Sequence, residues 1–415
     1  MRSDVVVAGS GVAAAAVASR LIDAGYQVLL LRTPGPGIPG AEILPPEAQA
    51  QIEVLGWAGV FDDAGVAVVE GFENYWNWHD PVIKPGPFLH VERIALARSA
   101  LAFVIRRGAS IRDMQRLPPL GPEDEGGVLV TLDGVESRFR AGVDATGRAA
   151  AWSKPVRREG RHVADLFEGP PAPSPLCGRV VLELGGERWA YRAGLIGSTT
   201  VGVVARGASH RQLDPPLAVA LGVSAEPFSF VGRRPSFPQW ATEPARGRRL
   251  AVGDAAFAAD PLAGQGLRFA MASANAAAVA IDALVRSDHP ALALAYYRDF
   301  VNLARARHLS ALVELRAGRA SPAPAVRIPD VLRFIARPRL TALNVGGTLT
   351  PDVAYELPDG ALVRWLGGFD LRHLCRLAHE PILTHELSLR LQAEGLSAIE
   401  TKLLIESCLY HKVLG

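Results

Sequence analysis

The chain is poor in cysteine. Among its 415 residues there are only three, Cys177, Cys375 and Cys408, and no Cys-x-x-Cys pair occurs. Three scattered thiols are too few to build a disulfide framework or a thiolate metal site. We therefore predict buried or inert thiols and no bound metal.

An excess of either charge sign is also missing. Lys and Arg number 44 against 42 Asp and Glu, which gives a formal net charge of +2. This balance lacks the basic excess that nucleic-acid binding requires. A content of 49% hydrophobic residues excludes a disordered chain. The composition predicts a globular enzyme of more than one domain, with no nucleic-acid partner.

Long uninterrupted apolar runs are absent too. The most apolar stretches, residues 5–22 and 251–285, are broken by Gly, Ser, Arg or Asp, which favours buried strand-turn-helix units over membrane spans. The first residues lead directly into a β-branched run, without the charged and apolar regions of a secretion signal. We predict a cytoplasmic protein with no membrane association.

A glycine turn follows the first apolar run. Residues 5–8 predict a parallel strand, and Gly9-Ser10-Gly11-Val12-Ala13-Ala14 comes directly after it. Gly9 permits a tight turn, Gly11 lets backbone N–H groups approach a pyrophosphate, and Ala14 lets the next helix pack closely. An Ala-rich helix and a second strand at 27–31 complete the unit, which predicts a dinucleotide site.

One position departs from the usual dinucleotide pattern. An acidic residue commonly ends the second strand and accepts the ribose hydroxyls, but this chain has Arg32-Thr33 there. We expect Arg32 to contact a phosphate or to stack on the adenine.

A second Gly-Asp segment lies about 240 residues later. Strand residues 249–252 lead into Gly253-Asp254, then Pro261, Gly264 and Gly266, and a long Ala-rich helix follows. This order resembles the second FAD-binding motif of the superfamily that contains flavin monooxygenases, geranylgeranyl reductases and flavin halogenases. The resemblance implies that Asp254 contacts the ribityl chain and that Pro261, Gly264 and Gly266 line the flavin ring. The positive end of the helix that begins near Leu267 would favour a reduced, anionic flavin.

Two shorter segments resemble the same superfamily. They are residues 89–93, whose Arg93 usually reaches the pyrophosphate, and residues 143–148, at a strand end over the FAD. Because only one dinucleotide fingerprint is present, we expect electrons from transiently bound NAD(P)H or from a flavin reductase. The predicted FAD-binding residues are Gly9, Gly11, Val12, Ala13, Ala14, Arg32, Thr33, Glu42, Arg93, Asp144, Gly147, Gly253, Asp254, Pro261, Gly264, Gly266 and Leu267.

The segment at residues 40–56 resembles the Gly-Glu-x-x-Pro stretch and following helix of flavin halogenases and their relatives. Tryptophan halogenases next carry a Lys that handles the halogenating species. Residues 70–78 contain no Lys here, although Lys84 is near in sequence, and the later strand at 187–194 keeps Trp189 without the family's Ile-Pro. Halogenation is therefore not favoured.

Aromatic residues suggest the substrate pocket. Trp76, Trp78 and Trp189 provide flat stacking walls, and with Pro261 and Gln265 they are our pocket candidates. A strand that faces the core explains the run at 72–78 equally well. No side chain is assigned as catalytic acid or base.

These motifs predict an α/β fold in three parts. They are a Rossmann-like FAD-binding domain of the glutathione-reductase type (1–150 and 240–320), an inserted β-sheet substrate domain (65–90 and 151–239), and a small helical, winged-helix-like domain (330–415). Strands at 177–183, 188–193 and 199–205 are expected to roof the flavin.

The last 85 or so residues predict short amphipathic helices at 371–378, 382–393 and 397–409 with helix-turn-helix spacing. Recurrent Glu residues deny this unit a basic footprint, so we expect either a peptide-docking module or a structural appendage. His373, His379 and His385 recur every six residues, which does not stack them on one helical face and argues against a metal site.

As a whole the chain most resembles the flavoprotein maturases of tryptophylquinone enzymes, including the monooxygenase of quinohemoprotein amine dehydrogenase biogenesis and the flavoproteins that accompany lysine and glycine oxidases. The resemblance implies that reduced FAD and O2 form a flavin C4a-hydroperoxide, which hydroxylates a tryptophan side chain of a partner polypeptide. Two alternatives stay open. One is a small-molecule flavin halogenase or geranylgeranyl-type reductase, and the other is a non-catalytic flavoprotein maturation chaperone.

Overall fold

The apolar runs at the start of the chain form the centre of a parallel sheet. In the computed structural model its strand order is β18-β19-β10-β1-β2-β6, with only β18 antiparallel. The strands are β1 (Val5–Ala8), β2 (Val28–Arg32), β6 (Ser110–Asp113), β10 (Ala141–Asp144), β18 (Ala245–Arg246) and β19 (Arg249–Ala251). All residues of β1 and β10 are buried, as expected for a sheet covered on both faces.

The structure describes residues 3–415 except 36, 76–81, 125, 172–178, 184–187, 208–210, 287–289, 317–328, 346–347, 359, 361, 367–368, 395, 397–400, 402–403, 406–407 and 410–411. The predicted linker at 321–324 and the candidates Trp76 and Trp78 therefore lie outside the described residues.

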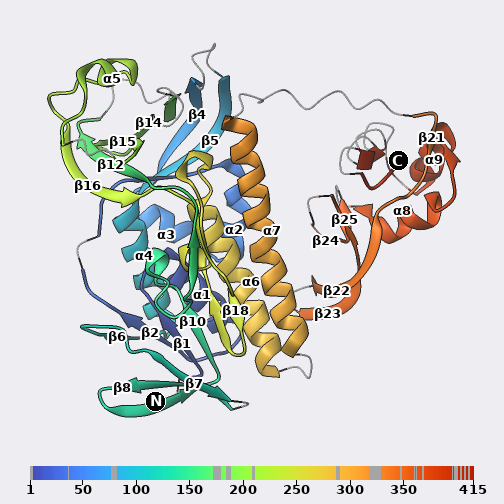
Figure 1. Cartoon of the computed structure of the whole chain (residues 1–415), viewed down its shortest axis with the longest axis horizontal. Coiled ribbons are helices and arrows are strands. Elements are labelled where there is room, and N and C mark those ends of the chain that lie inside the picture. Colours follow the sequence, from blue (N-terminus) through green and yellow to red (C-terminus); the bar gives the residue numbers. More distant parts are fainter. Residues whose placement is uncertain are drawn as a thin grey trace.

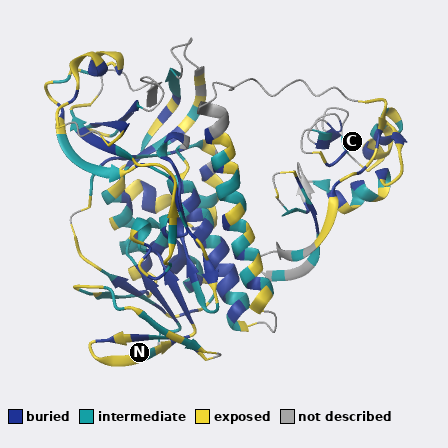
Figure 2. Ribbon diagram, viewed as in Figure 1, coloured by how far each residue is buried: buried dark blue, intermediate teal, exposed yellow. Residues whose placement is uncertain are grey.

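Six of the described helices pack around the central sheet and against one another (Figure 1). They are α1 (Val12–Asp23), α2 (Gln49–Val54), α3 (Ala58–Asp63), α4 (Arg93–Arg106), α6 (Gly266–Arg286) and α7 (Pro290–Arg316). α1 packs against α6, and α6 against α7. By length and composition α6 could cross a membrane, but 67% of its most apolar window is buried inside the protein. Figure 2 shows the buried residues gathered in the central sheet and in these inner helices.

An eight-stranded sheet lies over one end of this unit, in the order β16-β12-β15-β14-β13-β4-β5-β3. Its strands are β3 (Ala41–Leu44), β4 (Ala67–Tyr75), β5 (Val82–Glu92), β12 (His162–Gly169), β13 (Arg179–Glu183), β14 (Trp189–Gly194), β15 (Thr199–Arg206) and β16 (Ser229–Pro235). The three predicted strands are present as β13, β14 and β15. We call this sheet the roof.

Smaller elements complete the first 260 residues or so. They are a meander of β7 (Leu120–Asp124), β8 (Gly127–Leu132) and β9 (Val135–Phe139), a sheet of β11 (Val156–Arg158), β17 (Gln239–Ala241) and β20 (Phe257–Ala258), helix α5 (Pro215–Ala220), and the 3-10 turns η1 (Pro46–Ala48), η3 (Gly147–Ala149), η4 (Gly253–Ala255) and η5 (Pro261–Ala263).

The C-terminal unit contains more strand than the sequence predicts. Its elements are β21 (Val331–Leu332), β22 (Arg337–Val345), β23 (Thr348–Glu356), β24 (Leu362–Val363), β25 (Trp365–Leu366), β26 (Phe369–Asp370), α8 (Leu371–Ala378), β27 (Ile382–Leu383) and α9 (Thr384–Ala393). Helix α8 has the predicted bounds. The helix predicted from 382 begins at Thr384, because Ile382 and Leu383 pair with β21. Much of the helix predicted at 397–409 lies outside the described residues.

The C-terminal unit has its own core and lies beside α7 (Figure 1). Leu371, Leu374, Leu387 and Cys408 are fully buried in that core. Leu303 of α7 packs against it, and the hairpin of β22 and β23 contacts α7 and α6. Helix α7 therefore contacts both the C-terminal unit and helix α6 of the first part of the chain.

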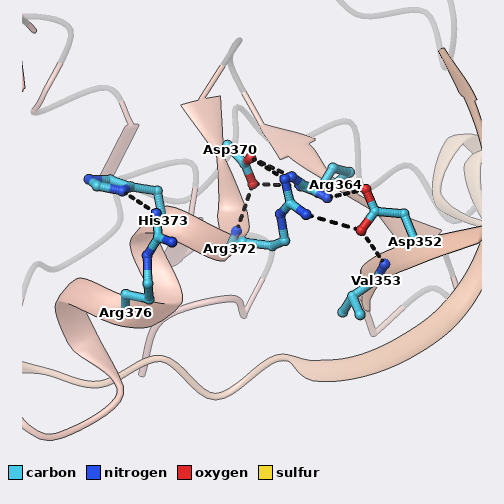
Figure 3. A network of polar contacts seen from close by, with 7 residues as sticks. All are labelled: Asp352, Val353, Arg364, Asp370, Arg372, His373 and Arg376. Atoms are coloured by element: carbon cyan, nitrogen blue, oxygen red, sulfur yellow. Dashed lines mark hydrogen bonds and ion pairs between the residues drawn. The ribbon is translucent and has the colours of Figure 1, made fainter.

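A closed network of charges ties this hairpin to α8 (Figure 3). The Arg364 guanidinium donates to both carboxylate oxygens of Asp370, at 2.6 Å each, and to Asp352 at 2.7 Å. Arg372 reaches the same two carboxylates from the exposed side, at 3.1 Å from Asp352 and 3.4 Å from Asp370. Two arginines and two aspartates balance, and Arg364 is only 3% exposed.

Candidate functional site

A cavity of about 790 Å³ opens where β1 and β10 end and α1 and α6 begin. Residues from both predicted motifs line it together with residues of α4 and of the roof. They are Ser10, Gly11, Val12, Ala13, Arg32, Gly35, Gly37, Ile38, Glu42, Arg93, Ile94, Ala97, Arg98, Leu101, Ala145, Gly147, Arg234, Val252, Asp254, Gly266, Leu267 and Ala270. We call this cavity the cleft.

The first turn fits a dinucleotide for reasons of backbone geometry. Gly9 has φ of 121°, and a Cβ placed on it would lie 2.3 Å from the carbonyl oxygen of Ala145, so only glycine fits. Gly11 caps α1 without any side-chain hydrogen bond to the free N–H groups of the first turn. These N–H groups face the cleft, and a helix N-terminus of this kind attracts an anion such as pyrophosphate.

Arg32 lies at the edge of the cleft and is already paired. Its guanidinium donates to both carboxylate oxygens of Asp113, at 2.5 and 2.7 Å, and this pair lowers the pKa of Asp113. The pairing follows from the parallel register, which sets Arg32 of β2 opposite Asp113 of β6. The acidic group that the sequence lacks at the end of β2 is thus present on the neighbouring strand.

The second turn places a carboxylate in the cleft. Gly253 has φ of 57°, and a Cβ there would lie 2.7 Å from the Ala13 side chain, so glycine lets this turn approach α1 closely. Its N–H donates to Ser273 Oγ at 2.9 Å. Asp254 follows and lines the cleft, and Gly266 at the start of α6 lines it too.

A smaller cavity of about 180 Å³ adjoins the cleft under the roof. It shares Glu42, Arg93, Arg234, Asp254 and Gly266 with the cleft. Its remaining lining residues are Ile43, Arg148, Ala164, Tyr191, Pro235, Ala259, Pro261 and Gly264. We call it the inner pocket. It contains the three residues predicted to line a flavin ring, Pro261, Gly264 and Gly266.

Charged side chains from five different elements meet where the two cavities join. Arg93 of α4 forms an ion pair with Glu42 of β3, and Arg234 of β16 lies 3.8 Å from the same carboxylate. Arg148 lies 4.0 Å from Asp254. Burial lowers the pKa of both Arg148 and Arg234, although a guanidinium keeps its proton throughout the physiological range.

Arg148 is fixed by backbone carbonyls. It donates to the carbonyl oxygens of Phe237, at 2.8 Å, and Ala259, at 3.3 Å, and its guanidinium lies 5.4 Å from the Phe237 ring centre. These contacts hold it against the turn that carries Pro261.

The same turn is supported from α7. His308 is 4% exposed, and its Nε2 accepts a hydrogen bond from the Asp260 N–H at 2.9 Å. Asp260 in turn caps η5 by accepting from the Leu262 N–H at 3.0 Å. The acceptor role of Nε2 requires a neutral ring, with the proton on Nδ1. His308 therefore positions the turn beside the inner pocket.

Several predicted site residues lie elsewhere. The Asp144 carboxylate accepts hydrogen bonds from the N–H groups of Thr146 and Trp152, so it shapes the loop after β10 and does not line either cavity. Trp189 is 5% exposed and packs beside Tyr191 in the roof core. Thr33 and Gln265 are outside both lining sets. Trp189 likewise lines neither cavity.

Among the charged and aromatic residues that line the inner pocket, three were not predicted from the sequence. They are Arg148, Tyr191 and Arg234. Arg148 stands one residue after the predicted Gly147, and its position after a strand end was a usable signal. Tyr191 and Arg234 come from roof strands, and the sequence did not reveal which face of those strands meets the cleft. Every cationic residue lining the cavities in the described part of the chain is an arginine.

No protein-family model and no curated protein sequence matches this chain. Solved structures do. The peptidyl tryptophan dihydroxylase QhpG, essential for tryptophylquinone cofactor biogenesis, superposes with a TM-score of 0.70 at 22% identity, over 99% of both chains. The flavin-dependent halogenase CmlS gives a TM-score of 0.76 at 16% identity, over 100% of this chain and 96% of its own. The flavin-dependent brominase Bmp2 gives 0.65 at 20% identity, over 77% of this chain and 88% of its own.

The chain thus has the fold of flavin-dependent monooxygenases and halogenases, which confirms the resemblance that its motifs predicted. FAD is the cofactor of this fold, and the cleft fits it. The free N–H groups of α1, the crowded turns at Gly9 and Gly253 and the Asp254 carboxylate supply an anion site, close backbone approach and a hydroxyl acceptor.

Proposed function

We propose that this protein is an FAD-dependent monooxygenase that hydroxylates a tryptophan side chain of a partner polypeptide during biogenesis of a tryptophylquinone cofactor. Bound and reduced, FAD supplies activation of O2 for transfer of oxygen to an electron-rich carbon. NAD(P)H or a flavin reductase would supply the electrons.

The observation that carries the proposal is the chemistry of the inner pocket. Its described cations are Arg93, Arg148 and Arg234, and no lysine is among its described lining residues. A lysine amine can lose its proton and take up an electrophilic halogen, whereas a guanidinium, whose pKa is much higher, keeps its proton and does not. The pocket therefore favours oxygen transfer over halogenation.

The polypeptide substrate is supported by a different feature. It is the likeness to QhpG, a peptidyl tryptophan dihydroxylase, at 22% identity over 99% of both chains. The halogenase CmlS also matches the C-terminal unit, at the lower identity of 16%, so coverage alone does not distinguish the two. That unit has a core of its own beside α7.

The chain's own residues would then have distinct roles. The α1 turn and Asp254 hold FAD, and the turn at Pro261, braced by Arg148 and His308, fixes one wall of the inner pocket. Tyr191 from the roof provides an aromatic wall that excludes water and orients an indole.

The test is mass spectrometry of a tryptophan peptide. FAD-loaded protein, reduced with NAD(P)H or dithionite and then exposed to O2, is incubated with a library of peptides that each carry one tryptophan. We expect a gain of about 16 or 32 Da, since each oxygen atom adds about 16 Da, located on tryptophan. Matched peptides with phenylalanine in place of tryptophan stay unchanged.

The alternatives give different results in the same experiment. A halogenated product that requires chloride or bromide identifies a halogenase, and saturation of an isoprenoid without O2 identifies a reductase. Protein that holds FAD and leaves every peptide unmodified, whatever the reductant, contradicts the proposal and favours the chaperone.

A further inference from the structure

Arg234 stands out among the charged residues of the site. It is on β16, where the cleft and the inner pocket join, and it lines both cavities. Within the described part of the chain its guanidinium makes no hydrogen bond. Its nearest carboxylate is Glu42 at 3.8 Å, which is already bound by Arg93.

The side chain is nevertheless held in place. Only 17% of it is exposed, and Nη2 lies 3.3 Å from the position that a Cβ on Gly40 would take. Gly40 has φ of 143°, a conformation that favours glycine, and the guanidinium lies beside it. A charged group confined in this way, with its donors facing a cavity, is arranged for a ligand.

The charges of the inner pocket do not balance. Its described lining contains three arginines, Arg93, Arg148 and Arg234, and two carboxylates, Glu42 and Asp254, which leaves one positive charge. Glu42 pairs with Arg93. Arg148 lies 4.0 Å from Asp254, and the buried Asp260 carboxylate beside the pocket also acts on its guanidinium. Arg234 shares Glu42 with Arg93, which binds that carboxylate more closely, so the charge of Arg234 is only partly compensated. A desolvated cation of this kind is stabilised by an anion.

We propose that Arg234 is the anion-binding residue of this site and that its ligand is a delocalised oxygen anion. Two sources share this chemistry. One is the pyrimidine edge of reduced FAD, which carries a negative charge when deprotonated, and the other is a carboxylate on the substrate. The planar fork of the guanidinium matches either anion through two N–H groups. The inference needs FAD in the cleft and does not depend on tryptophan hydroxylation.

The experiment compares Arg234→Met and Arg234→Lys with the wild-type protein. The matched control is Arg157→Met, because Arg157 is exposed on β11 and lines neither cavity, so it removes the same charge elsewhere. Bound FAD is verified by its visible spectrum, and folding by the melting temperature.

The first arm measures the midpoint potential of bound FAD without substrate. If the anion is reduced FAD, Arg234→Met weakens binding of the reduced form about tenfold relative to the oxidised form. For a two-electron couple this lowers the potential by about 30 mV. Arg234→Lys gives a smaller change, and Arg157→Met gives none.

The second arm titrates the oxidised, FAD-loaded proteins with acetate and benzoate, followed through the flavin absorption. If the anion is a substrate carboxylate, these ions bind the wild-type protein and Arg157→Met alike, and Arg234→Met binds them at least about tenfold more weakly. The potential is then unchanged.

Folded, FAD-loaded Arg234→Met with an unchanged potential and unchanged carboxylate binding would overturn the inference. If Arg234→Met does not retain FAD, the same two measurements on Arg234→Lys decide. That variant keeps the positive charge and loses the two parallel N–H donors of the guanidinium. The midpoint potential and the carboxylate titration can both be measured even if no tryptophan is hydroxylated. The anion-binding role of Arg234 and the proposed function can therefore fail independently.

Discussion

Two clusters of arginine and carboxylate lie in different parts of this molecule, and their charge balance differs. In the C-terminal unit, Arg364 and Arg372 meet Asp352 and Asp370, and every charge has a partner (Figure 3). At the junction of cleft and inner pocket, three lining arginines meet two lining carboxylates, and Arg234, which shares Glu42 with Arg93, faces a cavity. The closed cluster holds the fold together, whereas the open one is arranged to hold something that the chain does not itself supply.

This difference has a physical basis. Burying a charge is costly unless a partner of opposite charge compensates it, and a buried pair that loses one partner destabilises the protein strongly. Mutation of a closed network therefore changes the stability of the fold. In an open network a bound ligand neutralises part of the buried charge, so mutation of its residues changes the affinity for that ligand.

The largest effect is expected from breaking the closed cluster. Arg364→Met leaves Asp352 and Asp370 without their buried partner. Because these carboxylates are 28% and 32% exposed and keep Arg372, the free energy of unfolding of the C-terminal unit should fall by about 2–3 kcal/mol. Denaturant unfolding of both proteins measures it. Arg372→Met is the matched control, because its side chain is 48% exposed, and it should cost far less. Equal losses in the two variants would contradict the closed-network account.

Breaking the open cluster should act on FAD. Asp254→Ala removes the carboxylate shared by both cavities, so we expect FAD affinity to fall about ten- to hundredfold, the loss of one hydrogen bond to a charged group. Fluorescence titration of the apoprotein with FAD measures it. Glu136→Ala, on exposed β9, is the control and should bind FAD normally. A large loss of stability with unchanged FAD affinity would show that Asp254 belongs to the fold instead.

The core of the C-terminal unit offers a pH test. Burial raises the pKa of the Cys408 thiol from 9.0 to about 12. The folded protein thus keeps this proton after the unfolded chain has lost it. Stability from this group is complete below pH 9 and falls as the pH rises from 9 towards 12, by about 1 kcal/mol near pH 10.

Denaturant unfolding of wild-type protein and Cys408→Ala across this range isolates the effect. The difference between the two proteins should shift in favour of the alanine variant as the pH rises. A difference that does not change with pH would mean that the thiol is solvated.

The smallest effect is expected at the edge of the cleft. Asp113→Ala releases Arg32 from an exposed pair, and such pairs contribute little. FAD affinity should change by no more than about a few-fold, in either direction. A loss as large as that of Asp254→Ala would show that the Arg32–Asp113 pair contacts the dinucleotide directly. FAD titration again provides the measurement.

The sequence predicted what depends on local order. The turns at Gly9 and Gly253 depend on short-range glycine geometry, and the bounds of α8 depend on its own periodicity and the Asp370 cap, so all three were found. The parallel pairing of β2 with β6 joins residues far apart in the sequence, so the Asp113 partner of Arg32 was not predicted.

The sequence did not predict the inward face of the roof strands or the C-terminal hairpin, and the two reasons are related. Whether Tyr191 and Arg234 face the cavity depends on strand register, and one residue of slip reverses the face. The hairpin of β22 and β23 contains Pro338 and Pro351, which argue against strands in a sequence pattern, and no element was predicted over residues 337–356.

Oxygen transfer to a polypeptide is the central claim, and isotope labelling tests it most directly. FAD-loaded, reduced protein is mixed with a single-tryptophan peptide under ¹⁸O₂, and the peptide is then sequenced by mass spectrometry. The account predicts ¹⁸O on the tryptophan side chain, with none when ¹⁶O₂ and labelled water are used instead. Reoxidation of the flavin with an unmodified peptide, or a halogen in place of oxygen, would contradict it.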